Sequence, residues 1–377
     1  MSSVRITLAT PSRHTWSETF IAAHIAGLKD VVLVLSDGTL PYSANGSALL
    51  TPRNQSERLR FVFERRIRKK GNAALLRDRI TKQLRNHRTD VLLAEYGPTA
   101  EKLIDSAREA GVPLVAHFHG YDAHKLEILE RYGNYKRLFH AAAAIVVVSR
   151  AMERQMLALG APREHLHYIV YGTDTERFTS GDPATNPPHF VAVGRFTDKK
   201  APQLTLLAFR KAWRKHPQAR LTMAGAGPLW EAVRQLVQSY GMEAVVDLPG
   251  VLPPEQVAAR LRRARAFVQH SLTPSDHDME GTPLAVLEAM ASGLAVISTL
   301  HAGIPDVVAH GKRGLLSAEY DIDAMAAHII QLIEHPDQAA AMGQAGRAYV
   351  SANHRIEDRI GVLQQLLEQV VAEHHRV

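Results

Sequence analysis

Two glutamates eight positions apart, Glu280 and Glu288, bracket a stretch whose residue types suit ligand binding. Between them, Thr282 and Pro283 are favoured at the N-cap and in the first turn of a helix, and Gly293 is favoured just past its end. Seven helical steps of about 100° would bring Glu288 nearly onto the face of the first position after Glu280. Carboxylates accept hydroxyl hydrogens, and a helix N-terminus offers unpaired N–H groups to an anion. The pattern therefore predicts a site for a phosphorylated ligand that carries hydroxyl groups.

Two cations and a glycine turn are predicted to serve the same ligand. Arg195 and Lys200 lie five positions apart, directly after the strand-like run 189–193, and could converge on a diphosphate. A turn with Gly225 and Gly227 follows another strand-like run and would let the backbone approach a phosphate closely. Each signal is weak alone, but all of them follow strands, and ligands bind at that edge of a parallel sheet.

Alternating strand-like and helix-like segments must position these residues. Such alternation is typical of a doubly wound parallel sheet, and it stops at a Gly-, Pro- and Asn-containing stretch and then restarts. We therefore predict an α/β protein with two facing Rossmann-like domains and a ligand cleft between them. The predicted parts are an N-terminal domain at 1–178, a linker at 179–188, a C-terminal domain at 189–350 and a helix at 351–377 that crosses back to the first domain. The expected strands are 4–9, 31–35, 91–94, 113–117 and 144–148, then 189–193, 220–224, 245–248, 266–269 and 294–298; helices are expected at 18–28, 203–216 and 229–239.

Length and composition set limits on the class of protein. A chain of 377 residues favours two domains, and 46% apolar with 22% charged residues is typical of a folded soluble protein. The absence of cysteine excludes disulfides, thiolate metal sites and cysteine nucleophiles. The N-terminus lacks the apolar core of a signal peptide, and the longest apolar run, 141–148, is too short to span a bilayer. We expect a cytoplasmic protein, peripheral on the inner face of the cytoplasmic membrane.

Most of the positive charge lies in one segment. Residues 58–88 contain twelve Lys or Arg and two acids, a net charge of +10 against +7 for the whole chain. Leu59, Phe63 and Ile67 recur at helical spacing, which predicts basic amphipathic helices broken near Gly71. Docking on an anionic membrane surface and a solvated helical face are equally compatible with this pattern. No aromatic interleaving supports nucleic-acid binding, and no nucleic acid is expected as a partner.

These residues also match the motifs of a known family. The block 189–316 resembles the donor domain of the retaining GT-B glycosyltransferases of family four. The residues at 278–283 and at 301–305 are similar to the corresponding sequences of the bacterial exopolysaccharide, colanic-acid type branch of that family. The matching donor-domain motifs are Glu280-x7-Glu288 with Gly281-Thr282-Pro283, Gly194-Arg195…Lys200 and Gly225-x-Gly227-Pro228, and the matching segments of the first domain are 17–21, 117–122 and 171–178.

The resemblance implies a role for each matching residue. Arg195 and Lys200 would bind the diphosphate of a nucleotide-sugar donor and stabilise charge on the leaving group. Glu280 would contact the transferred sugar, and Glu288 the ribose. The resemblance implies catalytic roles for His119, Glu280, Arg195 and Lys200. It implies donor binding by Arg195, Lys200, Glu280 and Glu288, together with Gly194, Gly225, Gly227, Val251, Gly281, Thr282, Pro283, Leu284 and Ala285. It implies an acceptor side formed by Ser12, Arg13, His119 and Asp122, in which Asp122 would fix the His119 loop.

The implied activity is a retaining glycosyltransferase of hexosyltransferase type that acts in cell-surface glycan biosynthesis. It would move a sugar from a nucleotide-diphosphate donor to a lipid-linked or polysaccharide acceptor. Fixed cations and helix N–H groups can stabilise the departing diphosphate, so we expect no metal and no other cofactor. The alternatives are a GT-B nucleotide-sugar epimerase or phosphorylase and a non-catalytic sugar-nucleotide-binding protein. The sequence specifies neither the nucleotide, the sugar, the acceptor nor the oligomeric state.

Overall fold

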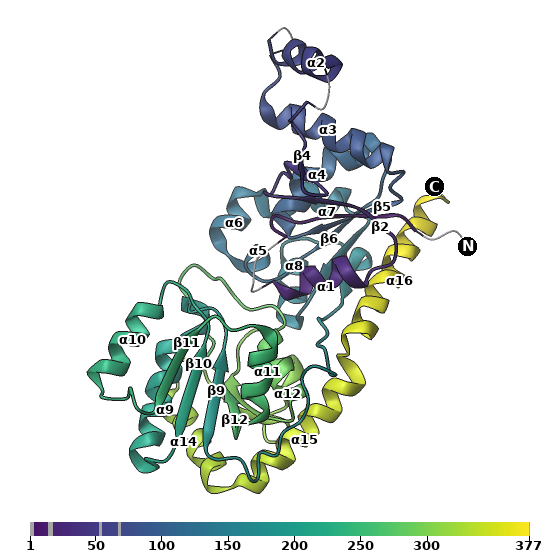
Figure 1. Cartoon of the computed structure of the whole chain (residues 1–377). Coiled ribbons are helices and arrows are strands. Elements are labelled where there is room, and N and C mark those ends of the chain that lie inside the picture. Colours follow the sequence, from purple (N-terminus) through teal and green to yellow (C-terminus); the bar gives the residue numbers. More distant parts are fainter. Residues whose placement is uncertain (1–3, 14–17, 53–54, 67–68, 377) are drawn as a thin grey trace. The chain divides into compact units, whose positions relative to one another are not determined.

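The computed structural model describes residues 4–13, 18–52, 55–66 and 69–376 (Figure 1). They form two compact units. The first holds the described residues up to Val147, Glu153–Ile169 and the described residues from Ile360 onward. The second holds Val148–Met152 and Val170–Arg359. Two predicted members of the basic segment, Ile67 and Arg68, lie outside the described residues.

A mostly parallel sheet forms the core of the first unit. Its described strands run in the order β4-β3-β2-β1-β5-β6-β7-β8, with β3 and β4 antiparallel and the others parallel. This edge hairpin, whose turn is Asn45-Gly46, is not among the predicted strands. Both turn residues have positive φ (46° and 81°), as a two-residue hairpin turn requires. The strands are β1 (Ile6–Ala9), β2 (Val31–Ser36), β3 (Ser43–Ala44), β4 (Ser47–Ala48), β5 (Val91–Glu95), β6 (Leu114–His117), β7 (Ala144–Val147) and β8 (Leu166–Tyr168).

Helices connect these strands, and the C-terminal helix completes the unit. Leu363, Leu367 and Val370 of α16 (Ile356–His374) pack with Ile6 and Leu8 of the central strand β1 in one buried apolar cluster. No helix of the described residues is long and apolar enough to span a membrane. The helices before α16 are α1 (Thr19–Gly27), α2 (Gln55–Arg66), α3 (Asn72–Asn86), α4 (Gly97–Ala110), α5 (Tyr121–His124), α6 (Leu126–Arg131), α7 (Lys136–Ala141) and α8 (Arg150–Ala158), with 3₁₀ turns at Gly133–Tyr135 and Arg163–His165.

The sheet of the second unit is parallel throughout its described strands, in the order β11-β10-β9-β12-β13-β14. Alternate side chains of its central strand face two separate cores. Phe190 and Ala192 pack with residues of α9, α10 and α14, whereas Val191 packs with residues of α11, α12 and α15. Helices therefore cover both faces, which confirms the predicted doubly wound α/β architecture. The elements are β9 (His189–Val193), α9 (Pro202–Lys215), β10 (Arg220–Ala224), α10 (Trp230–Ser239), β11 (Val246–Gly250), α11 (Pro254–Arg262), β12 (Ala266–Val268), α12 (Leu284–Ala291), β13 (Ala295–Thr299), α13 (Ile304–Val307), β14 (Gly314–Ser317), α14 (Ile322–Glu334) and α15 (Pro336–Asn353), with a 3₁₀ turn at Asp198–Lys200.

The stretch 179–188, predicted as a linker, packs inside the second unit. The N–H of Gly181 donates to the carbonyl of Ser292 at 3.3 Å, and Asn186 Nδ2 donates to the carbonyl of Ala264 at 2.9 Å. A Cβ at Gly181 would lie 1.8 Å from the carbonyl oxygen of Arg262. The Gly and Asn that make this stretch resemble a linker therefore serve close packing.

Candidate functional site

Two glycine-containing loops lie together at the carboxyl ends of β9 and β10. The N–H of Phe196 donates to the carbonyl of Ala226 at 2.9 Å, so the two loops are hydrogen-bonded to each other. A Cβ at Gly225 would lie 1.8 Å from the carbonyl oxygen of Gly194, and one at Gly227 would lie 2.5 Å from that of Phe196. Both glycines also have positive φ (146° and 154°). Only glycine fits either position, and the turn that it permits holds the Gly194 loop in place.

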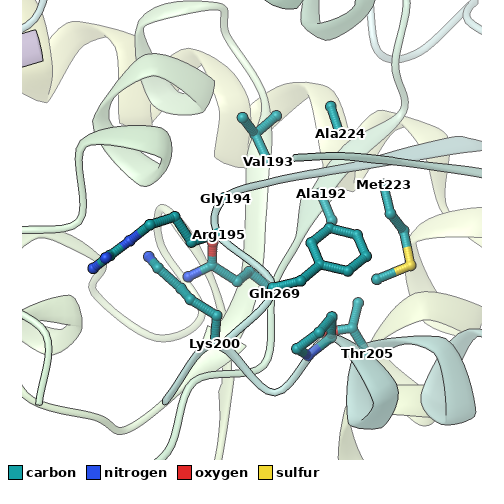
Figure 2. Close-up of a pocket in the computed structure, with 11 residues that line it drawn as sticks. Ala192, Val193, Gly194, Arg195, Lys200, Thr205, Met223, Ala224 and Gln269 are labelled. Carbon is teal, nitrogen blue, oxygen red and sulfur yellow. The ribbon is translucent and has the colours of Figure 1, made fainter. Parts of the chain in front are cut away.

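The Gly194 loop lines a small pocket that is open to solvent (Figure 2). Arg195 and Lys200 both belong to its wall, together with Gln269, which follows β12. Arg195 is exposed, and none of the described residues forms an ion pair or hydrogen bond with its guanidinium. With its amide oxygen turned toward Lys200, Gln269 accepts from Lys200 Nζ at 3.2 Å and donates to Val193 O at 3.1 Å. Arg195 is thus the cation available to a ligand, while Lys200 is held.

Glu280 is a buried carboxylate. One of its oxygens is paired, and the other, called the open oxygen below, has no hydrogen-bond partner among the described residues. Its Oε2 forms an ion pair with Lys200 Nζ at 3.0 Å. Its Oε1 is buried and has no hydrogen-bond partner among the described residues. Burial alone would raise the pKa of this carboxyl, but the charges of Lys200 and Lys199 outweigh burial and bring the pKa of Glu280 to about 2. A buried, ionised oxygen without a donor is suited to accept a hydroxyl of a ligand.

The helix that follows Glu280 starts one residue later than predicted. Pro283 is the N-cap of α12 and Leu284 its first residue, so Pro283 does not lie in the first turn. Thr282 does not cap the helix, because its Oγ1 donates to the carbonyl of Val148. Gly281, between Glu280 and Thr282, is buried. Since a helix leaves its first N–H groups without acceptors inside the helix, those of Leu284 and Ala285 are available to an anion.

Glu288 and Val251 lie in the same unit. Glu288 is partly exposed on α12, and burial raises its pKa to about 7, against the opposing charges of Arg177 and Lys200. The strand expected at 245–248 extends further, because β11 continues through Gly250. Val251 follows β11 and is 44% exposed. The donor-binding residues predicted from the sequence thus all lie in the second unit.

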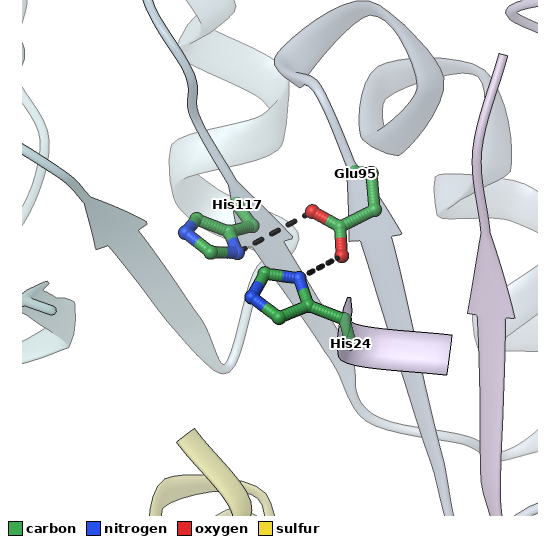
Figure 3. Close-up of side chains that lie close together, drawn as sticks. All are labelled: His24, Glu95 and His117. Carbon is green, nitrogen blue, oxygen red and sulfur yellow. Dashed lines mark hydrogen bonds and ion pairs between the residues drawn. The ribbon is translucent and has the colours of Figure 1, made fainter. Parts of the chain in front are cut away.

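The residues predicted for the acceptor side lie in the first unit, where His119 contacts a buried cluster that was not predicted from the sequence. The carboxylate of Glu95, the last residue of β5, lies between imidazoles (Figure 3). Its Oε1 is 2.8 Å from His24 Nδ1, and its Oε2 is 3.3 Å from His117 Nδ1 and 2.7 Å from His119 Nε2. Burial would raise the pKa of Glu95, but these imidazoles hold it well below the ordinary value. Burial also lowers the pKa of His119 to about 3.

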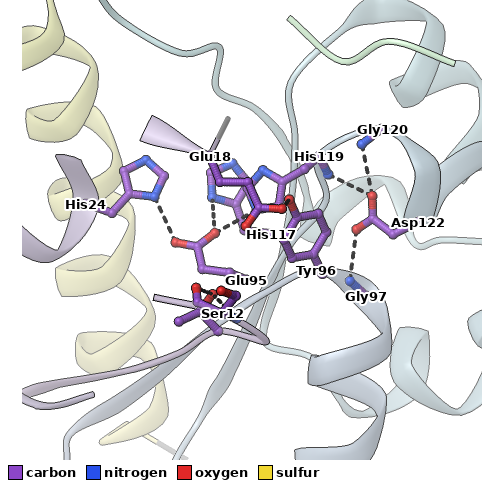
Figure 4. A network of polar contacts seen from close by, with 11 residues as sticks. Ser12, Glu18, His24, Glu95, Tyr96, Gly97, His117, His119, Gly120 and Asp122 are labelled. Carbon is purple, nitrogen blue, oxygen red and sulfur yellow. Dashed lines mark hydrogen bonds and ion pairs between the residues drawn. The ribbon is translucent and has the colours of Figure 1, made fainter. Parts of the chain in front are cut away.

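Asp122 fixes the backbone of the His119 loop (Figure 4). Its Oδ1 accepts from the N–H groups of His119 and Gly120, both at 2.9 Å, and its Oδ2 accepts from that of Gly97 at 3.0 Å. Burial raises the pKa of Asp122 to about 6 against these three donors. In the loop after β1, Thr10 Oγ1 donates to the carbonyl of Ser12 at 2.8 Å. Arg13 belongs to the same loop and lies near the hairpin turn at Gly46.

Donor atoms of His24, Glu95 and His117 lie within 4.8 Å of one another, a mixed nitrogen and oxygen set of a kind that binds transition metals. His24 Nδ1 and His117 Nδ1 lie 2.8 Å and 3.3 Å from the carboxylate oxygens of Glu95, so each imidazole is within ion-pair distance of that carboxylate. One signal could have revealed it. Glu95 and His117 end adjacent parallel strands, which is where ligands and functional side chains gather.

Comparison with known proteins agrees with the two units. The family model "Glycosyltransferase Family 4" matches residues 21–177, and the model "Glycosyl transferases group 1" matches residues 174–349. The colanic acid biosynthesis glycosyltransferase WcaL of Escherichia coli (strain K12) is 37% identical over 249 residues, 63% of this chain and 60% of that protein. The amylovoran biosynthesis glycosyltransferase AmsK of Erwinia amylovora is 31% identical over 287 residues, 74% of this chain and 70% of that protein. The chain spans about 60% of the length of WcaL.

Solved structures share the fold at low sequence identity. HepE of Anabaena, in complex with UDP, has a TM-score of 0.75 at 16% identity and covers 97% of this chain and 100% of its own. Sucrose-phosphate synthase of Thermosynechococcus elongatus has a TM-score of 0.74 at 18% identity and covers 98% of this chain and 100% of its own. Together with the two family models and the relatives, these matches show that the chain belongs to the GT-B glycosyltransferases of family four and is similar to those named for exopolysaccharide biosynthesis.

Proposed function

We propose that this protein is a retaining, metal-independent glycosyltransferase of exopolysaccharide biosynthesis. It moves a sugar from a nucleotide-diphosphate donor to a lipid-linked or polysaccharide acceptor. The observation that carries the proposal is the open oxygen of Glu280, buried beside Lys200 in the same unit as the exposed guanidinium of Arg195. This combination offers a hydroxyl acceptor together with cations for a diphosphate. The names of WcaL and AmsK support the pathway.

The chemistry follows from the charges that develop when a sugar–phosphate bond breaks. Positive charge grows on the sugar ring and negative charge on the diphosphate. Arg195, Lys200 and the N–H groups at the start of α12 stabilise the diphosphate without reorganising, which is usually the largest catalytic contribution. Glu280 and Gln269 hold Lys200 in place before the donor binds. The acceptor attacks the face from which the diphosphate leaves, and the leaving phosphate accepts its proton.

The remaining roles divide between the two units. Glu280 accepts hydroxyls of the transferred sugar, and Glu288 accepts those of the ribose. We assign His119 to the sugar and acceptor, with Asp122 as the residue that holds its loop, and we assign Ser12 and Arg13 to the acceptor side.

A membrane partner is part of the proposal, because α2 exposes an amphipathic surface. Leu59, Val62 and Phe63, spaced by three and one residues on the helix, are 69%, 44% and 46% exposed. Arg65 and Arg66 are exposed at its end. Exposed apolar side chains flanked by cations are the pattern of a helix that lies on an anionic bilayer.

Vesicle sedimentation tests this part. Charge reversal at Arg65 and Arg66 should abolish binding to vesicles with anionic lipid and leave nucleotide affinity intact. Charge reversal at Arg214 and Lys215, exposed at the end of α9, is the matched control and should have little effect. Equal binding by both variants would remove the membrane surface from the proposal.

A thermal-shift panel tests the donor site. UDP, GDP, ADP and CMP, each alone and with its sugars, are added to wild type and Glu288→Ala with and without EDTA. A ligand at a hundred times its Kd stabilises by about 2.7 kcal/mol. We expect one nucleotide to stabilise wild type but not the variant, whether or not EDTA is present. No shift from any nucleotide would refute the proposal, and sugar release or epimerisation without an acceptor would favour the phosphorylase or epimerase alternative.

A further inference from the structure

We propose that His301 is a positioning residue that sets the place of the Glu280 carboxylate and so controls how the enzyme recognises the donor sugar. The inference rests on the function proposed above, because it concerns the oxygen that accepts the sugar hydroxyls. His301 follows β13 and is completely buried. It touches Glu280 through the backbone.

The contacts of His301 determine its tautomer. The N–H of Glu280 points at His301 Nε2 over 3.3 Å, and His301 Nδ1 lies 2.7 Å from Glu319 Oε1. A backbone N–H can only donate, so Nε2 must carry the lone pair. The proton of the neutral ring then lies on Nδ1 and is donated to Glu319. Glu319 also accepts from the N–H of Thr273 at 2.8 Å, which fixes the carboxylate that orients the ring.

The residues after His301 brace the same loop by close packing. A Cβ at Gly303 would lie 2.4 Å from the carbonyl oxygen of Gly281 and 2.9 Å from Cβ of Ser149. No larger residue fits there without moving the loop that carries Glu280. His301 and Gly303 therefore hold adjacent residues of that loop, one by a hydrogen bond and one by contact.

Other side chains hold the rest of the loop. Lys199 Nζ donates to Asp278 Oδ1 at 2.7 Å and lies 3.4 Å from the carbonyl of Met279. Thr282 is held by its hydrogen bond to the carbonyl of Val148. Each residue from Asp278 to Thr282 thus has its own contact that restrains the loop, and the contact that restrains the backbone of Glu280 comes from His301.

This arrangement matters because Glu280 has one open oxygen. Lys200 holds Oε2, so the position of Oε1 depends on where the backbone of Glu280 lies. Loss of the imidazole would leave a buried N–H unpaired and let the loop move. A misplacement of about 1 Å can lower a rate by about 100-fold, and loss of a hydrogen bond to a charged group lowers an affinity by about 10-fold to 100-fold.

Isothermal titration calorimetry on the full chain tests the inference. The probes are UDP-glucose and GDP-mannose with UDP and GDP, and the measured quantity is the ratio of affinities for each nucleotide sugar and its nucleotide. In His301→Ala we expect this ratio to fall about 10-fold to 100-fold, with nucleotide affinity unchanged. His301→Gln should restore most of it, because its amide oxygen and nitrogen can replace the two ring nitrogens. His216→Ala, which removes a partly exposed imidazole paired with Glu334 at 3.0 Å, is the control and should keep the ratio.

A double-mutant cycle separates positioning from a general effect on stability. If His301 acts through the side chain of Glu280, then His301→Ala should change nothing further in a Glu280→Ala background. Additive losses, or an unchanged ratio in His301→Ala, would overturn the inference while leaving the proposed function intact. If His301→Ala does not fold, a ratio in His301→Gln as low as in Glu280→Ala would overturn the expected rescue. Wild type that binds neither nucleotide sugar nor nucleotide would overturn the proposed function, and this inference with it.

Discussion

Replacing Glu288 by Gln removes a carboxyl whose ionisation is linked to folding. Its pKa is raised from 4.5 to about 7 in the folded protein. Between these values the folded state holds a proton that the unfolded state has released, so stability falls as pH rises through this window and stays lower above it. At 1.36 kcal/mol per pKa unit the full effect is about 3 kcal/mol. Because Glu288 is partly exposed, this is an upper value.

The assay is thermal or denaturant unfolding of wild type and Glu288→Gln from pH 4.5 to 9. The variant should gain stability relative to wild type as pH rises, by up to about 10 °C in Tm for a unit of this size. Glu243→Gln, at an exposed position of the same unit, is the control and should show no such trend. A difference between wild type and Glu288→Gln that stays constant with pH would refute the reasoning.

The same carboxyl should make donor binding depend on pH. A ribose hydroxyl donates better to a carboxylate than to a carboxylic acid. Nucleotide affinity of wild type should therefore rise as pH passes upward through about 7, the pKa of Glu288. Titration calorimetry on Glu288→Gln provides the reference, because the diphosphate itself titrates in both proteins. Equal pH profiles would remove Glu288 from the ribose site.

Three further predictions concern other parts of the molecule. Glu95→Gln should destabilise the first unit by about 3 kcal/mol at neutral pH. This loss of stability should shrink as pH falls below 4.5, because the imidazoles around Glu95 hold its pKa low in the folded state. Denaturation at pH 7 and pH 4 measures the loss, and a pH-independent loss would contradict the prediction. Gly225→Ala should unfold or strongly destabilise the protein, because the new Cβ would lie 1.8 Å from Gly194 O. Gly361→Ala, which adds a Cβ in open space on α16, should instead stabilise the protein by up to about 1 kcal/mol. Similar Tm values for the two variants would be inconsistent with this packing. Arg195→Ala should weaken nucleoside diphosphate binding by about 10-fold or more with an unchanged Tm, because the guanidinium is exposed; a large fall in Tm would assign it a structural role.

The sequence predicted the fold because strand and helix periods are local properties. Arg195 and Gly225 lie in loops that follow short, buried strands, and Glu280 lies in the loop after another such strand. The glycines that permit close packing are visible as residue types. The start of α12 was wrong by one residue, since Thr282 prefers a tertiary acceptor to the helix cap. A cap and a distant carbonyl compete for the same hydroxyl, and only the folded chain decides between them.

The buried polar groups could not be predicted in the same way. Glu95 and His117 end the neighbouring strands β5 and β6, and His24 comes from α1, the helix that follows β1 beside β5 in the sheet. Strand order is a property of the whole sheet, and periodicity carries no information about it. The contact of His301 with Glu280 has the same origin, because it joins loops that follow different strands.

The packing of α16 has a consequence for synthesis on the ribosome. Leu363, Leu367 and Val370 are made after the whole of the second unit, yet they cover apolar side chains of β1, which is made before that unit. Among the described residues the second unit ends at Arg359, so it can fold while the first unit still lacks part of its core. During translation the earlier-made half therefore exposes apolar surface for longest, and it is the half that a chaperone would need to shield.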